Sequence, residues 1–257
     1  MTLHVRRFGS GREVLALHCS LAHGGAWSAV AAHLPGMTVV APDLPGHGRS
    51  PDWDGRCDFH TLTTWECLEL LPEAPVDLIG HSFGATVALR MALERPEAIR
   101  TLTLIEPVLF AAARAAEDPA WQQNVEALRP FAESMAAGDR EAAAAAFQAV
   151  WGGGVPFADI PASQRDYIAA RIHLIAVMDP MFQQDTAGLL AYGRLEALGL
   201  PVLLIEGAKS PPVIAAIQTE LARRLPQVTR AVVPDAGHMS PLTHPAEVAA
   251  RVAAHLA

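Results

Sequence analysis

The six residues Ile79-Gly80-His81-Ser82-Phe83-Gly84 contain the pattern Gly-x-Ser-x-Gly. The pattern follows an apolar run at 76–80 that predicts a buried strand, and it opens a helix-like stretch at 83–94. A serine on a tight strand-to-helix turn needs glycines on either side, because a Cβ atom there would collide with neighbouring backbone. The first N–H groups of the helix can then face developing negative charge. This context predicts that Ser82 is a nucleophile.

Short apolar runs alternate with helix-like stretches along much of the chain. Most runs are continuous rather than alternating in polarity, which is typical of strands buried on both faces of a parallel sheet. The predicted strands are 13–18, 38–41, 76–80, 101–106, 201–206 and 228–233, and the predicted helices are 27–34, 60–71, 83–94, 213–225 and 246–256. The fold class is therefore α/β, with a mostly parallel sheet flanked by helices. Residues 4–8 and 13–18, joined by Gly9-Ser10-Gly11, predict an opening hairpin.

The alternation stops after Glu106. Between 109 and 196 there is no convincing strand, and amphipathic, partly Ala-rich stretches at 121–137, 140–151 and 165–178 predict helices. An insertion of this length is too long for a loop, so we expect a helical cap over one end of the sheet. The predicted division is 1–108 for the first part of the core, 109–196 for the cap and 197–257 for the second part of the core.

Composition narrows the class of protein. The chain is 51% hydrophobic and 18% charged, which excludes a disordered protein, and its longest apolar runs have six residues. A membrane-spanning helix needs about twenty, so we expect no contact with membranes. A net charge of −8 without a basic stripe argues against nucleic-acid binding. The start lacks an apolar signal segment, and the three cysteines form no metal-like pair, so we expect free thiols and a cytoplasmic location.

Three further stretches, together with the Gly-x-Ser-x-Gly pattern, resemble the α/β-hydrolase superfamily over nearly the whole chain. His18-Cys19-Ser20-Leu21, followed by Trp27, resembles the oxyanion loop of that family, with Cys19 in place of a glycine. Asp43-Leu44-Pro45-Gly46-His47-Gly48-Arg49-Ser50 resembles a structural turn beside the site, and Asp235-Ala236-Gly237-His238-Met239 resembles the loop of the catalytic histidine. The resemblance implies an eight-stranded, mostly parallel sheet.

The resemblance also implies roles for individual residues. Ser82 is expected to attack an acyl carbonyl, while His238 takes its proton and later protonates the leaving group. The backbone N–H groups of Ser20 and Phe83 are expected to hold the oxyanion. No cofactor and no metal ion are expected, because the spacing of the histidines matches no ligand pattern.

The acid that orients the histidine departs from the family pattern. Relatives usually carry an Asp in a Gly-x-x-Asp turn, which here reads Gly207-Ala208-Lys209-Ser210. Glu106 stands at the tip of a predicted strand, a placement that resembles a subset of the superfamily including some haloalkane dehalogenases. An ionised acid is needed to fix the imidazole tautomer. We therefore expect Glu106 to be the acid, with Glu206 and Asp235 as alternatives.

Four side chains near these motifs or in the predicted cap are candidates for contact with a small-molecule substrate: Trp27, His81, Phe110 and Trp121. The favoured function is cofactor-independent hydrolysis of an ester or lactone of a small, mostly apolar acid through an acyl-enzyme on Ser82. A serine nucleophile disfavours alkyl-halide and epoxide chemistry, which needs a carboxylate. The alternatives are C–C bond hydrolysis, acyl transfer or cofactor-free peroxidation by the same triad, and a non-catalytic ligand-binding protein. The chain is expected to be a monomer or a homodimer.

Overall fold

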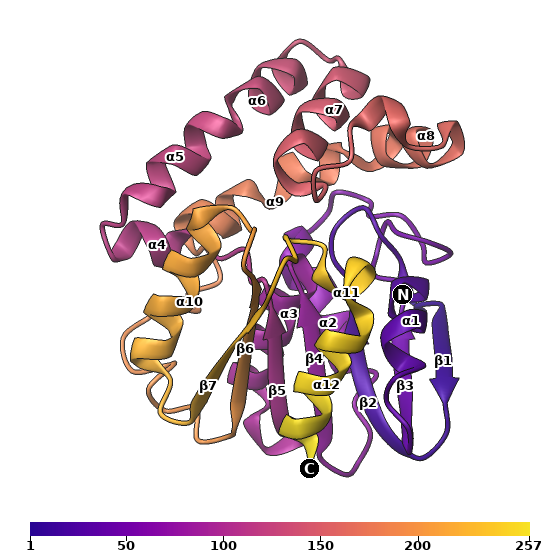
Figure 1. Ribbon diagram of the computed structural model, residues 1–257, viewed down its shortest axis with the longest axis vertical. Coiled ribbons are helices and arrows are strands. Elements are labelled where there is room, and N and C mark those ends of the chain that lie inside the picture. The colour runs from indigo at the N-terminus through magenta and orange to yellow at the C-terminus, as the bar shows by residue number, and fades with distance from the viewer.

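A seven-stranded sheet runs through the centre of the computed structural model, which describes all 257 residues (Figure 1). The strands are β1 (Val5–Gly9), β2 (Arg12–Leu17), β3 (Met37–Pro42), β4 (Val76–His81), β5 (Ile99–Ile105), β6 (Val202–Gly207) and β7 (Val228–Val233). They lie in the order β1-β3-β2-β4-β5-β6-β7, and every pair is parallel except β1 with β3. The predicted α/β class and mostly parallel sheet are confirmed, with seven strands instead of eight.

The first two strands do not pair with each other. β1 pairs antiparallel with β3, from Val5 opposite Pro42 to Gly9 opposite Thr38, and β3 therefore lies between β1 and β2. Gly11, with a φ of +123°, brings the link under the start of β3, where a Cβ atom would lie 2.0 Å from the Gly36 oxygen. The predicted opening hairpin is wrong: the glycine link does not make a tight turn but leaves room for β3 between β1 and β2.

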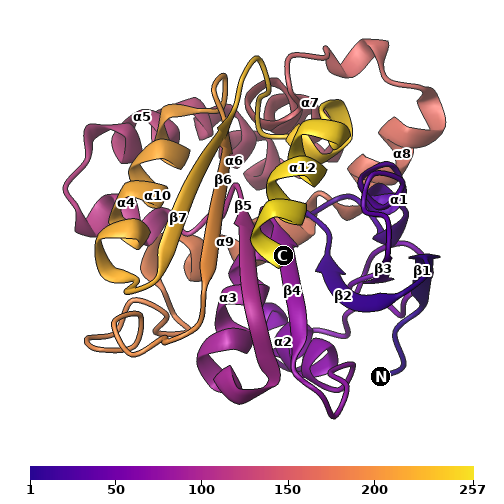
Figure 2. The ribbon, with the colours of Figure 1, turned by 60° about the horizontal axis from the view of Figure 1, so that its bottom comes forward.

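Helices cover both faces of the sheet (Figure 2). The core helices are α1 (Ser28–Ala31), α2 (Phe59–Leu68), α3 (Phe83–Glu94), α10 (Pro212–Arg224), α11 (Ser240–Thr243) and α12 (Pro245–Leu256), with short 3₁₀ helices at Gly24–Trp27 and Pro96–Ala98. Successive residues of β4 pack into the apolar clusters on opposite faces of the sheet: Leu78 packs on the side of α3, and Ile79 packs on the side of α12. Because both faces are buried, the strands read as continuous apolar runs.

A layer of helices lies over the carboxyl ends of the strands (Figure 1). It contains α4 (Phe110–Ala115), α5 (Pro119–Ala127), α6 (Arg129–Ala136), α7 (Arg140–Trp151), α8 (Ala162–Arg171) and α9 (His173–Gln184), with a 3₁₀ helix at Phe157–Asp159. These helices connect β5 to β6, which are neighbours in the sheet. They occupy the stretch for which a cap is predicted, and the boundaries at 109 and 196 stay predictions. None of the helices is long and apolar enough to cross a membrane.

Candidate active site

Ser82 lies on a sharp turn between β4 and α3. Residues other than glycine rarely adopt its φ of +55°, so the surrounding packing must hold the backbone in this conformation. A Cβ atom on Gly80 would lie 2.3 Å from the Gly84 oxygen, and one on Gly84 would lie 2.4 Å from the Leu17 oxygen. The glycines on both sides of the serine are therefore required by the close approach of α3 to β4 and β2.

The structure brings Ser82, His238 and Glu106 together from three parts of the chain. The Nε2 atom of His238 is 2.9 Å from the Ser82 hydroxyl oxygen, and its Nδ1 atom is 3.0 Å from a Glu106 carboxylate oxygen. Because a carboxylate can only accept, Nδ1 carries the proton and Nε2 is free to accept one from the serine. The three side chains are at most 7% exposed, so the hydrogen bonds are shielded from water.

Glu106 follows the last residue of β5, at the carboxyl edge of the sheet. Its backbone N–H donates to the Ile205 oxygen at 2.9 Å, which extends the pairing with β6, and its φ of +54° then turns the chain towards the cap. Its side chain is fully buried. One carboxylate oxygen faces His238, and the other accepts hydrogen bonds from the Gly207 N–H and the Ser210 hydroxyl.

Neither of the alternative acids contacts His238. Glu206 pairs with Arg230 at 3.1 Å, and its burial raises the pKa of its carboxyl above the usual value. Asp235 is exposed and pairs with Lys209 at 2.9 Å. Glu106 is the carboxylate within hydrogen-bond reach of the histidine.

Two backbone N–H groups, that of Phe83 beside Ser82 and that of Ser20 in the same cavity, have no acceptor in the protein. Phe83 is the first residue of α3, so its N–H has no partner within the helix, and the N–H of Ser20 likewise makes no hydrogen bond. Ser20 lines the same cavity as Ser82 and His238. The positive end of the α3 dipole adds to the attraction for negative charge at this place. Both N–H groups are thus available to an oxyanion.

A cavity of about 620 Å³ reaches the serine from the helical layer. Hydrophobic residues make up 13 of the 20 that line it. Among the lining residues are Phe110 and Trp121, two of the predicted substrate contacts, together with Phe131, Trp151, Ile175 and Phe182. The Trp151 ring lies 4.6 Å from the His238 ring, edge to face, so the carboxyl end of α7 covers the histidine.

The sequence profile of the α/β hydrolase family matches residues 14–251. The chain belongs to the α/β hydrolase family. The resemblance drawn from the four motifs is therefore confirmed.

Curated relatives of this α/β hydrolase include named esterases. The pimeloyl-(acyl-carrier protein) methyl ester esterase of Methylococcus capsulatus is 30% identical over 258 residues, which cover 95% of this chain and 94% of the relative. Lipase LipV of Mycobacterium tuberculosis is 40% identical over 111 residues, which are 42% of each chain. Among solved structures, an esterase from Exiguobacterium antarcticum matches with a TM-score of 0.76 at 17% identity, over 99% of this chain and 95% of that one. At that identity the match supports the fold alone.

Two buried histidines hold the loop at 18–21, which is the predicted oxyanion loop. The His18 Nε2 atom accepts from the Leu44 N–H at 2.9 Å, and the His47 Nε2 atom accepts from the Leu21 N–H at 3.0 Å. Burial lowers the pKa of His18 to about 3 and that of His47 to about 4. Both rings are therefore neutral, which leaves a nitrogen lone pair free to accept.

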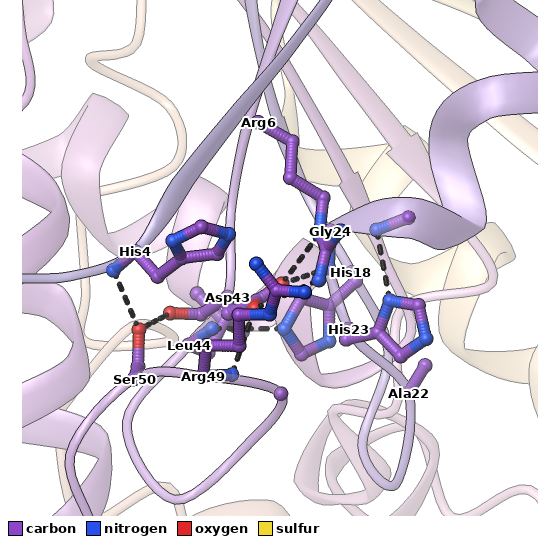
Figure 3. Close-up of polar contacts among 12 residues, drawn as sticks. His4, Arg6, His18, Ala22, His23, Gly24, Asp43, Leu44, Arg49 and Ser50 are labelled. Carbon is purple, nitrogen blue, oxygen red and sulfur yellow. Dashed lines mark hydrogen bonds and ion pairs between the residues drawn. The ribbon is translucent and has the colours of Figure 1, made fainter.

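The Asp43 carboxylate bonds to three segments of the same region (Figure 3). Its fully buried carboxylate accepts from the Gly24 N–H at 2.7 Å and the Arg49 N–H at 2.9 Å, and it pairs with Arg6 at 3.2 Å. Burial opposes the charge, but these donors outweigh it and hold the pKa of the carboxyl below its usual value. The ionised Asp43 carboxylate therefore joins β1 and the 3₁₀ helix at Gly24–Trp27 to the turn at 43–50.

The other two predicted substrate contacts do not reach the cavity. Trp27 is 2% exposed and packs in the cluster beside α12, on the opposite face of the sheet from α3. His81 lies under His238 and donates from its Nε2 atom to the His238 backbone oxygen at 2.8 Å. Burial lowers the pKa of His81 to about 3, which keeps it neutral. The predicted substrate-binding roles are wrong for both, because each side chain is used in packing or in supporting the histidine loop.

Cys19 is a buried small residue of the oxyanion loop. Burial raises the pKa of its thiol to about 12, so the thiolate that acyl transfer would need is disfavoured. No group of three or more His, Cys, Asp or Glu side chains is arranged to hold a metal ion.

Proposed function

We propose that the protein hydrolyses carboxylic esters through an acyl-enzyme on Ser82. The observation that carries the proposal is the unbroken chain of hydrogen bonds from the Ser82 hydroxyl through His238 to Glu106, at 2.9 and 3.0 Å, beside two N–H groups without acceptors. The named esterase from Methylococcus capsulatus, related over nearly the whole chain, supports ester hydrolysis as the reaction.

The steps follow from which atoms carry protons. The Ser82 oxygen attacks the ester carbonyl while its proton passes to Nε2 of His238, and the carbonyl oxygen becomes an oxyanion facing the N–H groups of Ser20 and Phe83. Glu106 stabilises the imidazolium through Nδ1–H. His238 then gives the proton to the leaving alcohol. A water molecule, deprotonated by the same nitrogen, attacks the acyl carbonyl. The bond to the Ser82 oxygen then breaks, the acid leaves, and His238 returns the proton to that oxygen.

The cavity favours an ester with a mostly apolar acyl or alcohol group. Its volume of about 620 Å³ and its aromatic wall suit a small or medium-sized molecule. A lactone would fit the same chemistry, because only the ring closure distinguishes it from an open ester. The cytoplasmic location, the monomeric or homodimeric state and the cap boundaries at 109 and 196 remain predictions from the sequence.

C–C bond hydrolysis, acyl transfer and peroxidation could use the same residues, but the relatives named as an esterase and a lipase favour ester hydrolysis. A ligand-binding protein without turnover would not need the bonded Ser82–His238–Glu106 arrangement.

The test is hydrolysis of p-nitrophenyl acetate, butyrate and octanoate by the wild type and by Ser82→Ala. We expect measurable turnover in the wild type and a loss of at least about 10³-fold in the variant, as for other triad nucleophiles. Ser163→Ala, an exposed serine on α8, is the matched control and should keep wild-type rates. A wild type inactive on all three esters, or a Ser82→Ala variant as active as the control, would contradict the proposal.

A further inference from the structure

Ser210 contacts the carboxylate that faces His238. It lies in the turn after β6, and its hydroxyl donates to the Oε1 atom of Glu106 at 2.6 Å. The Gly207 N–H donates to the same oxygen, while Oε2 faces Nδ1 of His238 at 3.0 Å. Both donors to Oε1 therefore come from one four-residue turn.

Backbone hydrogen bonds fix the position of this turn. The Lys209 N–H donates to the Ala236 oxygen at 2.8 Å, in the loop that carries His238, and the Ala208 N–H donates to the Val233 oxygen at 3.0 Å. The Ser210 N–H closes the turn on the Gly207 oxygen at 3.1 Å. The Ser210 hydroxyl is thus held relative to both β6 and the histidine loop.

A glutamate side chain has more rotatable bonds than an aspartate, so its carboxylate needs more contacts to keep one orientation. Glu106 is fully buried, and every lone pair without a donor is costly there. Without the Ser210 hydroxyl, Oε1 would keep a single donor and the carboxylate could turn away from Nδ1. A hydrogen bond from a neutral hydroxyl to a carboxylate is of the strong, charge-assisted kind.

We propose that Ser210 is a positioning residue for the proposed ester hydrolysis: its hydroxyl holds Glu106 towards His238, and the space between the carboxyl ends of β5 and β6 accepts one carboxylate. This inference rests on the proposed function. The Ser210 hydroxyl oxygen is 2.6 Å from Glu106, so an ionised acid at this position would lie against the Glu106 carboxylate and repel it.

The first test compares Ser210→Ala and Ser210→Thr on p-nitrophenyl butyrate. Ser210→Ala should lower kcat by about 10- to 100-fold, the effect of losing one hydrogen bond to a charged group, with KM changed by less than about threefold. Ser210→Thr keeps the hydroxyl and should recover most of the lost kcat. Thermal unfolding is measured for each variant, and Ser163→Ala again serves as the control.

The second test uses charge instead of deletion. Ser210→Asp places two carboxylates together at high pH, whereas at lower pH a protonated Asp can donate to Glu106 as the serine does. The ratio of the Ser210→Asp kcat to the wild-type kcat should therefore rise by about tenfold or more when the pH is lowered from about 9 to about 6. Ser210→Asn, of the same size and uncharged, should show a flat ratio. His238, the Glu206–Arg230 pair and the Lys209–Asp235 pair are the ionisable groups beside this turn, and Ser210→Asn keeps all of them without the added carboxylate, so it gives the baseline for the ratio.

Wild-type kcat in Ser210→Ala would overturn the inference, and so would a loss that Ser210→Thr does not reverse. A flat pH ratio for Ser210→Asp would also overturn it, and this comparison remains available if Ser210→Ala fails to fold. An inactive wild type would instead contradict the proposed function.

Discussion

The carboxylate of Glu106 is bonded on both oxygens, and one of those bonds reaches the histidine of the site. An amide at this position could offer its oxygen to Nδ1–H, but it would not supply the negative charge that stabilises an imidazolium. Its NH₂ group would also face the Gly207 N–H or the histidine, where a second donor is unfavourable. The site therefore needs both the negative charge of Glu106 and its two hydrogen-bond acceptor oxygens.

Glu106→Gln should lower kcat on p-nitrophenyl butyrate by about 10³- to 10⁴-fold, because the histidine loses its charged partner and its tautomer is no longer fixed. Steady-state kinetics and thermal unfolding of the purified variant measure this. The matched control is Asp235→Asn, an exposed acid three residues before His238 that pairs with Lys209 instead. A Glu106→Gln variant with the rates of wild type and of Asp235→Asn would rule out Glu106 as the acid.

Single residues differed in how far the sequence could predict them. Ser82 and His238 stand in local patterns whose glycines and neighbours are contiguous in the chain, so their geometry is encoded nearby. Glu106 could be predicted because a strand end places its residue at the carboxyl edge of the sheet. The bond from Ser210 to Glu106 joins positions 104 residues apart, and a serine alone carries no signal of such a partner. The same holds for His81, whose contact with the His238 backbone spans 157 residues.

The positions of helices and strands can be predicted from the spacing of apolar residues, but the pairing of the strands cannot. The predicted strand at 13–18 and the structure's Arg12–Leu17 nearly coincide, but nothing in β1 distinguishes β2 from β3 as its partner. In the cap, one predicted helix at 121–137 divides into α5 and α6, because Pro130 begins a new helix and cannot continue the previous one. Likewise, 165–178 spans the junction of α8 and α9 at Ile172. Apolar spacing continues across both breaks, so it could not reveal them.

The cap helices supply most of the cavity wall, and α9 contributes Ile175, Ala176, Asp179, Phe182 and Gln183. Enlarging Ala176 should therefore shorten the space for substrate without touching the hydrogen bonds of Ser82. We expect Ala176→Phe to lower kcat/KM for p-nitrophenyl octanoate by about tenfold or more while p-nitrophenyl acetate changes by less than about threefold. The ratio of the two rates measures the effect. Ala127→Phe, on α5 but outside the cavity, is the control, and an unchanged ratio in Ala176→Phe would show that substrate does not occupy this part of the cavity.

On the scale of the whole molecule, a sheet buried on both faces supports a site that lies between its carboxyl edge and the helices above it. Four buried histidines lie in this support, among them His60, whose ring centroid lies 5.9 Å from that of Phe83. Burial is the main cause that lowers their pKa values, to about 3 for His18, His60 and His81 and to about 4 for His47. In the unfolded chain they titrate near 6.5. Between about pH 4 and 6.5 the unfolded state therefore binds more protons than the folded state, and stability rises with pH across that range.

The melting temperature should accordingly fall as the pH is lowered from about 7 to about 4.5, since each such histidine contributes up to about 1.4 kcal/mol of unfolding free energy per pH unit. Differential scanning calorimetry in buffers of equal ionic strength measures it. A melting temperature that stays constant or rises as the pH is lowered would show that these rings are not held neutral in the folded protein.

The most direct measurement of the central claim is the intact mass and peptide map of the protein after exposure to a fluorophosphonate. Such a reagent phosphonylates a serine only where a base activates the hydroxyl and donors stabilise the phosphonyl oxygen. We expect one adduct, on Ser82, in the wild type, none in Ser82→Ala, and much slower labelling in Glu106→Gln. An unlabelled wild type, or an adduct on any other serine, would contradict the assignment of Ser82, His238 and Glu106 as the machinery of an ester hydrolase.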